Sequence, residues 1–319
     1  MVQQEVKRDE RVREFASLDE VLGGGIVLLD NCVRHADSAR SFLRDIYDIN
    51  LFNRINPSKV RHEIEGIETL SNLISLENVL TIQDVADEFF AYVEILGYKI
   101  GNISKTYKLY RKNQKRNKDC GISAEEGNDS IKNLHENAFR TYRQLLSKVV
   151  PASLLGGKER YALVERMVML LEDELKLKKD TSYHLGEHET DRAREKHADE
   201  KLVASAFCAS MHSDGPIKIL TQDTDFVSLV GVFSRLLCSE SFLPYNALLR
   251  DSLRSNPVIL YLKSSEGYEK LVDTSDSSRL FYPKNFEIYR KDRPRNNAIK
   301  AEIDRNWETW FAHTLTGQS

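Results

Sequence analysis

An uninterrupted apolar run that ends in an aspartate constrains the fold more than any other feature of this chain. Ile26 to Leu29 contains only branched aliphatic residues, and Asp30 closes the run. This pattern is typical of a strand buried on both faces, as in a parallel sheet covered by helices. The segments 217–220 and 257–262 have a similar character. We therefore expect a parallel β-sheet at the centre of the protein.

Segments with helical spacing of apolar residues lie between these strands. The spacing predicts helices over 36–47, 58–74 and 198–209, and long amphipathic stretches with little strand character fill 78–180. Strands and helices that alternate on both sides of a helical block predict a doubly wound α/β fold with an all-helical insertion. The expected parts are a first part of the sheet domain at 1–77, the helical insertion at 78–180, a second part of the sheet domain at 181–270, and a C-terminal extension with a closing helix at 271–319.

Composition limits the kind of protein that this chain can be. With 319 residues, of which 41% are hydrophobic and 30% charged, it can bury a core and fits neither the disordered nor the membrane class. Lys and Arg total 46 against 49 Asp and Glu, a net charge of -3, so a site for a polyanion has to be local. The four cysteines form no C-x-x-C pair, and no apolar run suits a signal peptide or a membrane span. We expect reduced thiols, no membrane partner and a cytoplasmic location.

Two acidic residues in the first part of the chain are candidates for a functional site. Asp30 follows a strand, and ligands bind at the carboxyl ends of strands in open α/β sheets; the alternative is a turn residue or a helix cap. On a helical wheel Glu63 falls at about 300°, beside Ile67 at about 340° and Ile74 at about 320°, inside the apolar stripe. A carboxylate there is costly unless it is paired or bound to a cation. The alternatives for Glu63 are a packing irregularity and a buried salt bridge to an arginine.

The second part of the chain supplies the other candidates. Asp199 lies on the buried face of its predicted helix, at the N-terminal end. The alternative is a first-turn acid that favours the helix dipole. The strand at 217–220 leads into Thr221, Asp223 and Asp225, so it delivers a hydroxyl and two carboxylates into the following turn.

Four segments resemble, in order, the signature blocks of PIN-domain nucleases. They are Ile-Val-Leu-Leu-Asp30, Val60 to Ile64, Asp199 to Ala206 and Leu220 to Phe226. The resemblance covers about residues 25–75 and 196–262, which is under half of the chain. It implies a parallel-sheet fold with an acidic pocket that binds Mg²⁺ or Mn²⁺ and cleaves RNA. By position, the acidic quartet is matched by Asp30, Glu63, Asp199 and Asp223, with Asp225 as a fifth carboxylate and Thr221 as the neighbouring hydroxyl.

The chemistry of these side chains suits that activity. Hard divalent cations take oxygen ligands and keep several waters, so a few converging carboxylates suffice to bind them. A two-metal arrangement activates the attacking water and neutralises the leaving oxygen, so no side-chain nucleophile is needed. We therefore expect a divalent-metal-dependent endoribonuclease. One alternative is a catalytically silent PIN-like module that binds RNA or protein. Another is a topoisomerase-primase-type metal site at Asp223 and Asp225, which leaves Glu63 and Asp199 unexplained.

A basic strip suggests where RNA binds. The strip lies in a stretch without acids, with tyrosines interleaved, and it consists of Lys105, Lys108, Arg111, Lys112 and Lys115. Such residues can contact phosphates while the tyrosines stack on unpaired bases, so we expect single-stranded RNA; the alternative is a solvated helix face. His184 to His188 matches the H-x-x-E-H zinc pattern, but Gly186 weakens the helix that this pattern needs. The protein partners that we consider are an inhibitor and a second copy of the chain.

Overall fold

The computed structural model describes residues 15–34, 57–113, 124–175, 198–223, 226, 229–231, 233–234 and 253–275. Several sequence predictions lie outside these ranges, among them the helix at 36–47, the closing helix of the C-terminal extension and the histidine pattern at 184–188. Within the described ranges the protein is α/β, with a six-stranded sheet in the order β1-β6-β5-β4-β2-β3.

Four neighbouring strands of the sheet are parallel to one another, as the sequence predicts. They are β2 (Ile26–Leu29), β3 (Val79–Leu80), β4 (Ile217–Thr221) and β5 (Val258–Ser264). The strands predicted at 26–29, 217–220 and 257–262 are thereby confirmed to within one or two residues. Their apolar side chains are buried on both faces, which explains why these runs do not alternate with polar residues.

The prediction of a purely parallel sheet is wrong, because the sheet is mixed. β6 (Gly267–Asp273) pairs antiparallel with β5, and β1 (Phe15–Ala16) pairs antiparallel with β6. Only Ser265 and Glu266 separate β5 from β6, and so short a connection joins antiparallel strands, since a parallel crossover needs a dozen residues or more. Gly267, with φ of 131°, supplies the backbone conformation that ends this turn.

Helices cover both faces of the sheet, as expected for a doubly wound fold. α6 (Lys158–Leu175) and α7 (Ala198–Ser210) pack on one face, against side chains such as Leu28 and Ile219. α3 (Pro57–Ile74), α4 (Gln83–Asn113) and α5 (Ala124–Ser147) contribute to the apolar core on the other face, which includes Val27 and Leu29. The short α1 (Leu18–Leu22) lies on this second face through Val21. None of the helices among the described residues has the length and apolar character that crossing a membrane requires.

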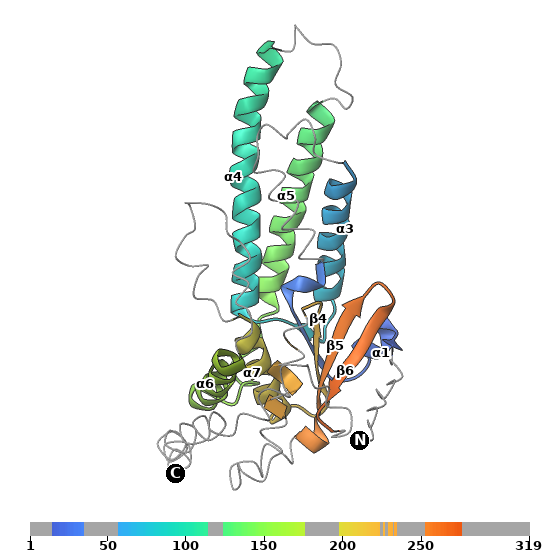
Figure 1. Ribbon diagram of the computed structural model, residues 1–319, viewed down its shortest axis with the longest axis vertical. Helices are drawn as coiled ribbons and strands as arrows, with labels where there is room; N and C mark the ends of the chain where they lie inside the picture. Colours follow the sequence, from blue (N-terminus) through green and yellow to red (C-terminus); the bar gives the residue numbers. More distant parts are fainter. Residues whose placement is uncertain are drawn as a thin grey trace, which may run out of the picture.

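Three helices form an arm that extends beyond the sheet. Figure 1 shows α3, α4 and α5 side by side along one axis, with α6 and α7 at the other end of the molecule. At about 1.5 Å per residue, the 31 residues of α4 are about 46 Å long. Most of the predicted insertion is therefore helical, but it starts with β3, which pairs with β2. Thr81 Oγ1 also donates to the carbonyl of Leu29 at 3.0 Å, so the base of α4 is tied to the sheet.

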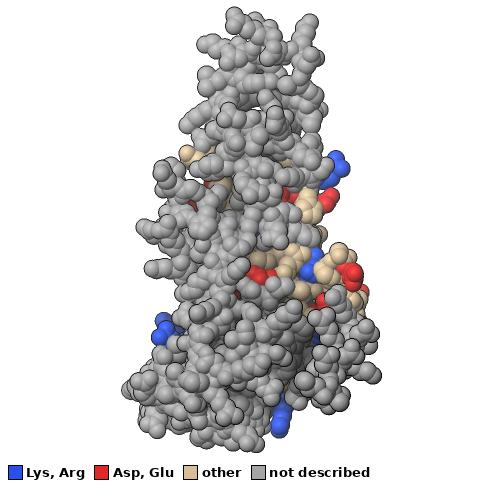
Figure 2. Space-filling view, viewed as in Figure 1, with Lys and Arg blue, Asp and Glu red and all other residues tan. Residues whose placement is uncertain are grey.

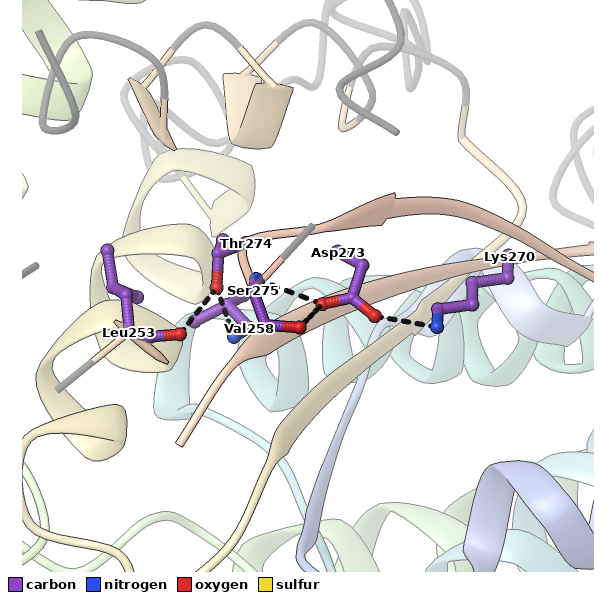
Figure 3. A network of polar contacts seen from close by, with 6 residues as sticks. All are labelled: Leu253, Val258, Lys270, Asp273, Thr274 and Ser275. Carbon is purple, nitrogen blue, oxygen red and sulfur yellow. Dashed lines mark hydrogen bonds and ion pairs between the residues drawn. The ribbon is translucent and has the colours of Figure 1, made fainter. Parts of the chain in front are cut away.

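Two local contacts set the positions of the strands. Gly25 enters β2 with φ of 75°, and a Cβ at this position would lie 2.0 Å from the carbonyl oxygen of Pro216. The close approach brings β2 against the start of β4. At the same end of the sheet, where the antiparallel β6 ends beside the start of β5, Asp273 is held by Lys270 at 2.6 Å and by Ser275 Oγ at 2.6 Å, as Figure 3 shows. This network closes the end of β6.

On the described surface in Figure 2, acidic and basic side chains are intermixed.

Candidate functional site

A hydrogen-bonded chain joins the carboxyl ends of β2 and β4. Asp30 follows β2 directly, and its backbone N–H donates to the carbonyl of Leu220 in β4 at 3.0 Å. Thr221, the last residue of β4, donates its hydroxyl to Asp30 Oδ2 at 2.7 Å. The backbone N–H of Asp223 donates to the same Thr221 hydroxyl at 2.9 Å. Three of the predicted site residues are thus brought together at one edge of the sheet.

Asp199 joins this group from α7. It is the second residue of that helix, where the helix dipole favours an acid, so the first-turn alternative describes its position correctly. Its environment goes beyond that alternative. Burial raises the pKa of Asp199 well above its ordinary value, and the negative charges of Asp30, Glu88 and Asp223 raise it too. The neighbouring Glu200 is buried as well and adds to this effect.

Asp30 has the same kind of environment. Its side chain is 1% exposed. Burial raises the pKa of Asp30 to about 6, with a further contribution from the charge of Asp223, although hydrogen bonds from Thr221 and Cys32 lower it. Carboxylates that raise one another's pKa lie within electrostatic reach of each other. We name Asp30, Asp199 and Asp223 the carboxylate site.

Cys32 lies beside the carboxylate site on η1 (Asn31–Arg34), the 3₁₀ helix that follows β2. Burial raises the pKa of its thiol well above the ordinary value, and so do the charges of Asp30, Asp199 and Asp223. The thiol is therefore protonated at neutral pH and donates a hydrogen bond to Asp30. The fourth charge that acts on it is that of Glu88.

Glu88 is a carboxylate that the sequence analysis missed. It lies in the second turn of α4, and its charge acts on both Asp199 and Cys32. Nearby, Lys201 of α7 donates to Asp84 Oδ1 of α4 at 2.7 Å, which ties the two helices together on the side of the site. The sequence showed no strand before α4; the short β3, which pairs parallel with β2, places the first turns of α4 at the edge of the sheet where Asp30 and Asp223 lie.

Glu63 lies in a different environment, inside the arm. Its Oε2 accepts the Tyr92 hydroxyl at 2.9 Å and lies 3.9 Å from Nη1 of Arg34. Glu63 and Arg34 are both 2% exposed. Burial raises the pKa of Glu63, while the guanidinium of Arg34 and the hydroxyl of Tyr92 lower it. This arrangement is the buried salt bridge to an arginine that the sequence left open as the alternative for Glu63.

The arginine of this pair connects the arm to the carboxylate site. Arg34 ends η1, four residues after Asp30, and its Nε donates to Asn31 Oδ1 at 2.9 Å. Its guanidinium carbon lies 3.8 Å from the ring centroid of Tyr92 and 5.0 Å from that of Phe89, both in α4. We name Arg34, Glu63 and Tyr92 the arginine cluster. It holds η1, and through η1 the start of the carboxylate site, against α3 and α4.

The backbone of η1 is also held from two other directions. A Cβ on Gly66 of α3 would lie 2.5 Å from the carbonyl oxygen of Arg34, so only a glycine allows this approach. Lys263 of β5 donates its Nζ to the carbonyl of Val33 at 2.9 Å. The segment after β2 is therefore fixed by α3, α4 and β5.

The remaining predicted residues are only partly described. Lys105, Lys108, Arg111 and Lys112 lie on the distal half of α4, where the backbone is helical. Asp225 and Lys115 lie outside the described residues.

In the part of the chain that the structure describes, no group of three or more His, Cys, Asp or Glu side chains is arranged closely enough to hold a metal ion by itself. Comparisons of the chain with protein-family models, with curated proteins and with solved structures found no match.

Proposed function

We propose that this protein is a divalent-metal-dependent endoribonuclease with a PIN-like core, which hydrolyses RNA phosphodiester bonds at the carboxylate site. The observation that carries the proposal is the environment of Asp30 and Asp199. Each lies at an end of a strand or a helix, Asp30 is buried and Asp199 partly buried, and desolvation together with the charges of other carboxylates raises the pKa of both. Such an arrangement is unfavourable for ionised carboxylates unless a cation offsets the charge.

The donor atoms fit Mg²⁺ or Mn²⁺ by their chemistry. The site offers carboxylate and hydroxyl oxygens, which hard divalent cations prefer. Mg²⁺ keeps several waters and is usually bound by one or two carboxylates together with substrate phosphates. A ready-made cage of three protein ligands is therefore not required. Carboxylates whose charges act on one another, without forming such a cage among the described residues, therefore suit the proposal.

The roles follow from the contacts. Asp30, Asp199 and Asp223 would hold the cation, and Glu88 adds a fourth carboxylate from α4. Thr221 orients Asp30 by its hydrogen bond and links it to the backbone of Asp223. When bound, the cation would supply an activated water and offset the charge on the phosphodiester. Glu63, which resembles the second acid of the family by position, is assigned to the arginine cluster instead.

Cleavage of a mixed RNA population with Mn²⁺ tests the proposal. Wild type should cut, with the cut sites mapped at nucleotide resolution, and Asp199→Asn should not. Asp30→Asn and Asp223→Asn are expected to lose activity in the same way while remaining folded. Glu65→Gln, which removes an exposed carboxylate of α3, is the matched control and should retain activity. Full activity in any of the three site variants would overturn the assignment.

A catalytically silent module is the second outcome of the same test, and cation titration identifies it. A cation at 100 times its Kd stabilises the folded state by about 2.7 kcal/mol. An enzyme that binds Mn²⁺ at the carboxylate site should therefore unfold several degrees higher with the cation, and Asp30→Asn should lose most of this gain. If wild type shows no stabilisation by Mn²⁺ and no cleavage of RNA, the result favours the silent module.

A further inference from the structure

One helix carries both the edge of the carboxylate site and the basic strip. α4 runs without interruption from Gln83 to Asn113. Glu88 lies near its start, and Lys105 and Lys112 lie in its distal half. At about 1.5 Å per residue, these lysines are about 26 and 36 Å from Glu88 along the axis. Because a single helix sets this spacing, the distance does not depend on how the arm packs.

The distal half of α4 has the charge that an RNA backbone requires. The sequence contains no Asp or Glu after Glu94 until Asp119, although the chain as a whole has a net charge of -3. Lys105, Lys108 and Lys112 follow Glu88 on the same continuous helix, so a strand that leaves the carboxylate site can reach the strip by running along α4.

An aromatic group lies between the two ends. Phe90 of α4 stacks on Tyr142 of α5 with ring centroids 4.6 Å apart, and Tyr142 lies 6.4 Å from Phe139. Phe139 is 37% exposed, and the guanidinium of Arg143 lies 4.7 Å from its ring centroid. Exposed aromatic rings with an arginine are surfaces on which unpaired bases stack. The charges of Asp87 and Glu94 beside Tyr142 disfavour phosphates at this level, so the exposed ring of Phe139 would meet bases rather than phosphates.

We infer that α4 sets a minimum length for the RNA substrate. The inference rests on the proposed ribonuclease function and specifies its substrate class as single-stranded RNA that reaches from the carboxylate site to the basic strip. At roughly 3.4 Å per nucleotide in a stacked strand, about 26 to 36 Å corresponds to about 8 to 11 nucleotides. Shorter RNAs contact the site alone, whereas longer RNAs also gain the phosphate contacts of the strip.

A length series of RNA tests the inference. Single-stranded RNAs of one repeated sequence, from about half to twice the 8 to 11 nucleotide threshold, are cleaved with Mn²⁺, and kcat/KM is measured for each. For wild type, kcat/KM should rise by about tenfold or more as the threshold is passed. Lys108→Gln combined with Arg111→Gln should flatten this rise. The variant should also reduce the salt dependence of binding to the long RNA, by about 0.7 in the log-log slope for each lost contact.

A matched control separates the strip from net charge. Lys158→Gln combined with Arg254→Gln removes two exposed positive charges outside the arm and should keep the wild-type length profile. A wild-type kcat/KM that is independent of length would overturn the inference and leave the proposed function standing. So would a strip variant that behaves like this control.

The proposed function can also fail while the role of the arm in RNA binding is still tested. If wild type cleaves no RNA of any length, the proposed function is overturned. Binding of the same labelled RNAs to the metal-free protein then decides the role of the arm. Affinity that does not change across the threshold overturns the inference, and affinity that rises with length and depends on Lys108 and Arg111 supports it.

Discussion

The carboxylate site and the arginine cluster meet at the segment after β2, which carries Asp30 and Arg34, and both contain a buried acid, but the charges around those acids differ in sign. Asp199 is surrounded by the charges of other carboxylates, whereas Glu63 faces the guanidinium of Arg34. Asp273, at the end of β6, is a third case. Burial by itself would raise its pKa, but hydrogen bonds from Lys270 and Ser275 lower the pKa below the ordinary value. Burial of an acid alone therefore does not indicate a metal ligand. The sign of the charge on the neighbouring side chains does.

The sharpest test of this comparison is activity. Asp199→Asn removes an oxygen ligand from the carboxylate site, so Mn²⁺-dependent cleavage should fall by more than about a hundredfold. Glu63→Gln changes only the arginine cluster that holds η1 beside the carboxylate site, so cleavage should fall by about tenfold. Initial rates on one RNA substrate at saturating Mn²⁺ measure both. Equal losses in the two variants would place Glu63 in the carboxylate site after all.

Stability should change in the opposite order. Glu63→Gln leaves the buried charge of Arg34 without its partner carboxylate, which typically costs about 3 to 5 kcal/mol of unfolding free energy. Asp199→Asn removes a charge that its neighbours repel, so the metal-free protein should gain about 1 kcal/mol or more at neutral pH. Urea denaturation with a chelator present measures both changes. A loss of stability in Asp199→Asn would contradict the comparison.

The pH dependence of stability isolates Asp30. Its pKa is raised from 3.8 to about 6 on folding, so between about pH 4 and 6 the folded state binds more protons than the unfolded state. Stability from this residue is therefore present at low pH and lost as the pH rises through 6. Relative to Asp30→Asn, the metal-free wild type should lose on the order of 3 kcal/mol over this window. Thermal unfolding of both proteins across the window provides the measurement, and parallel curves would refute the raised pKa.

The smallest effect is expected at Tyr92. Tyr92→Phe keeps the ring that contacts Arg34 but removes the hydroxyl that donates to Glu63 at 2.9 Å. The loss of one buried hydrogen bond should reduce the unfolding free energy by about 1 to 3 kcal/mol. Because the ring still holds η1, cleavage should stay close to wild type. A large loss of activity with unchanged stability would show that the hydroxyl acts in the carboxylate site.

Sequence reasoning located the strands and most of the carboxylate site because these depend on local pattern. The apolar run before Asp30 and the turn after Thr221 were readable, since the parallel strands that carry them are buried throughout. The sequence did not predict which arginine pairs with Glu63. A helical wheel places Glu63 on the inner side of α3, but it does not say which side chain the helix meets there. Glu88 was missed for the same reason, because its neighbours come from α7 and η1.

The antiparallel edge of the sheet was missed for a different reason. The turn at Ser265, Glu266 and Gly267 is a local signal for an antiparallel connection. It was missed because the buried run before it, 257–262, resembles an ordinary strand of a parallel sheet. The turn and the hydrogen bonds that join β1 to β6 decide the direction of this edge.

The amino-acid sequence by itself determined the alternation of strands and helices, the burial of the inner strands, and the placing of Asp30, Thr221 and Asp223 at or just after the ends of their strands. Periodicity and apolar content fix these features within single segments. Only the tertiary structure decided which charge each buried acid faces. That choice depends on segments far apart in the chain, such as Arg34 after β2 and Glu63 in α3, and electrostatic energy depends on distance in space rather than on position in the sequence.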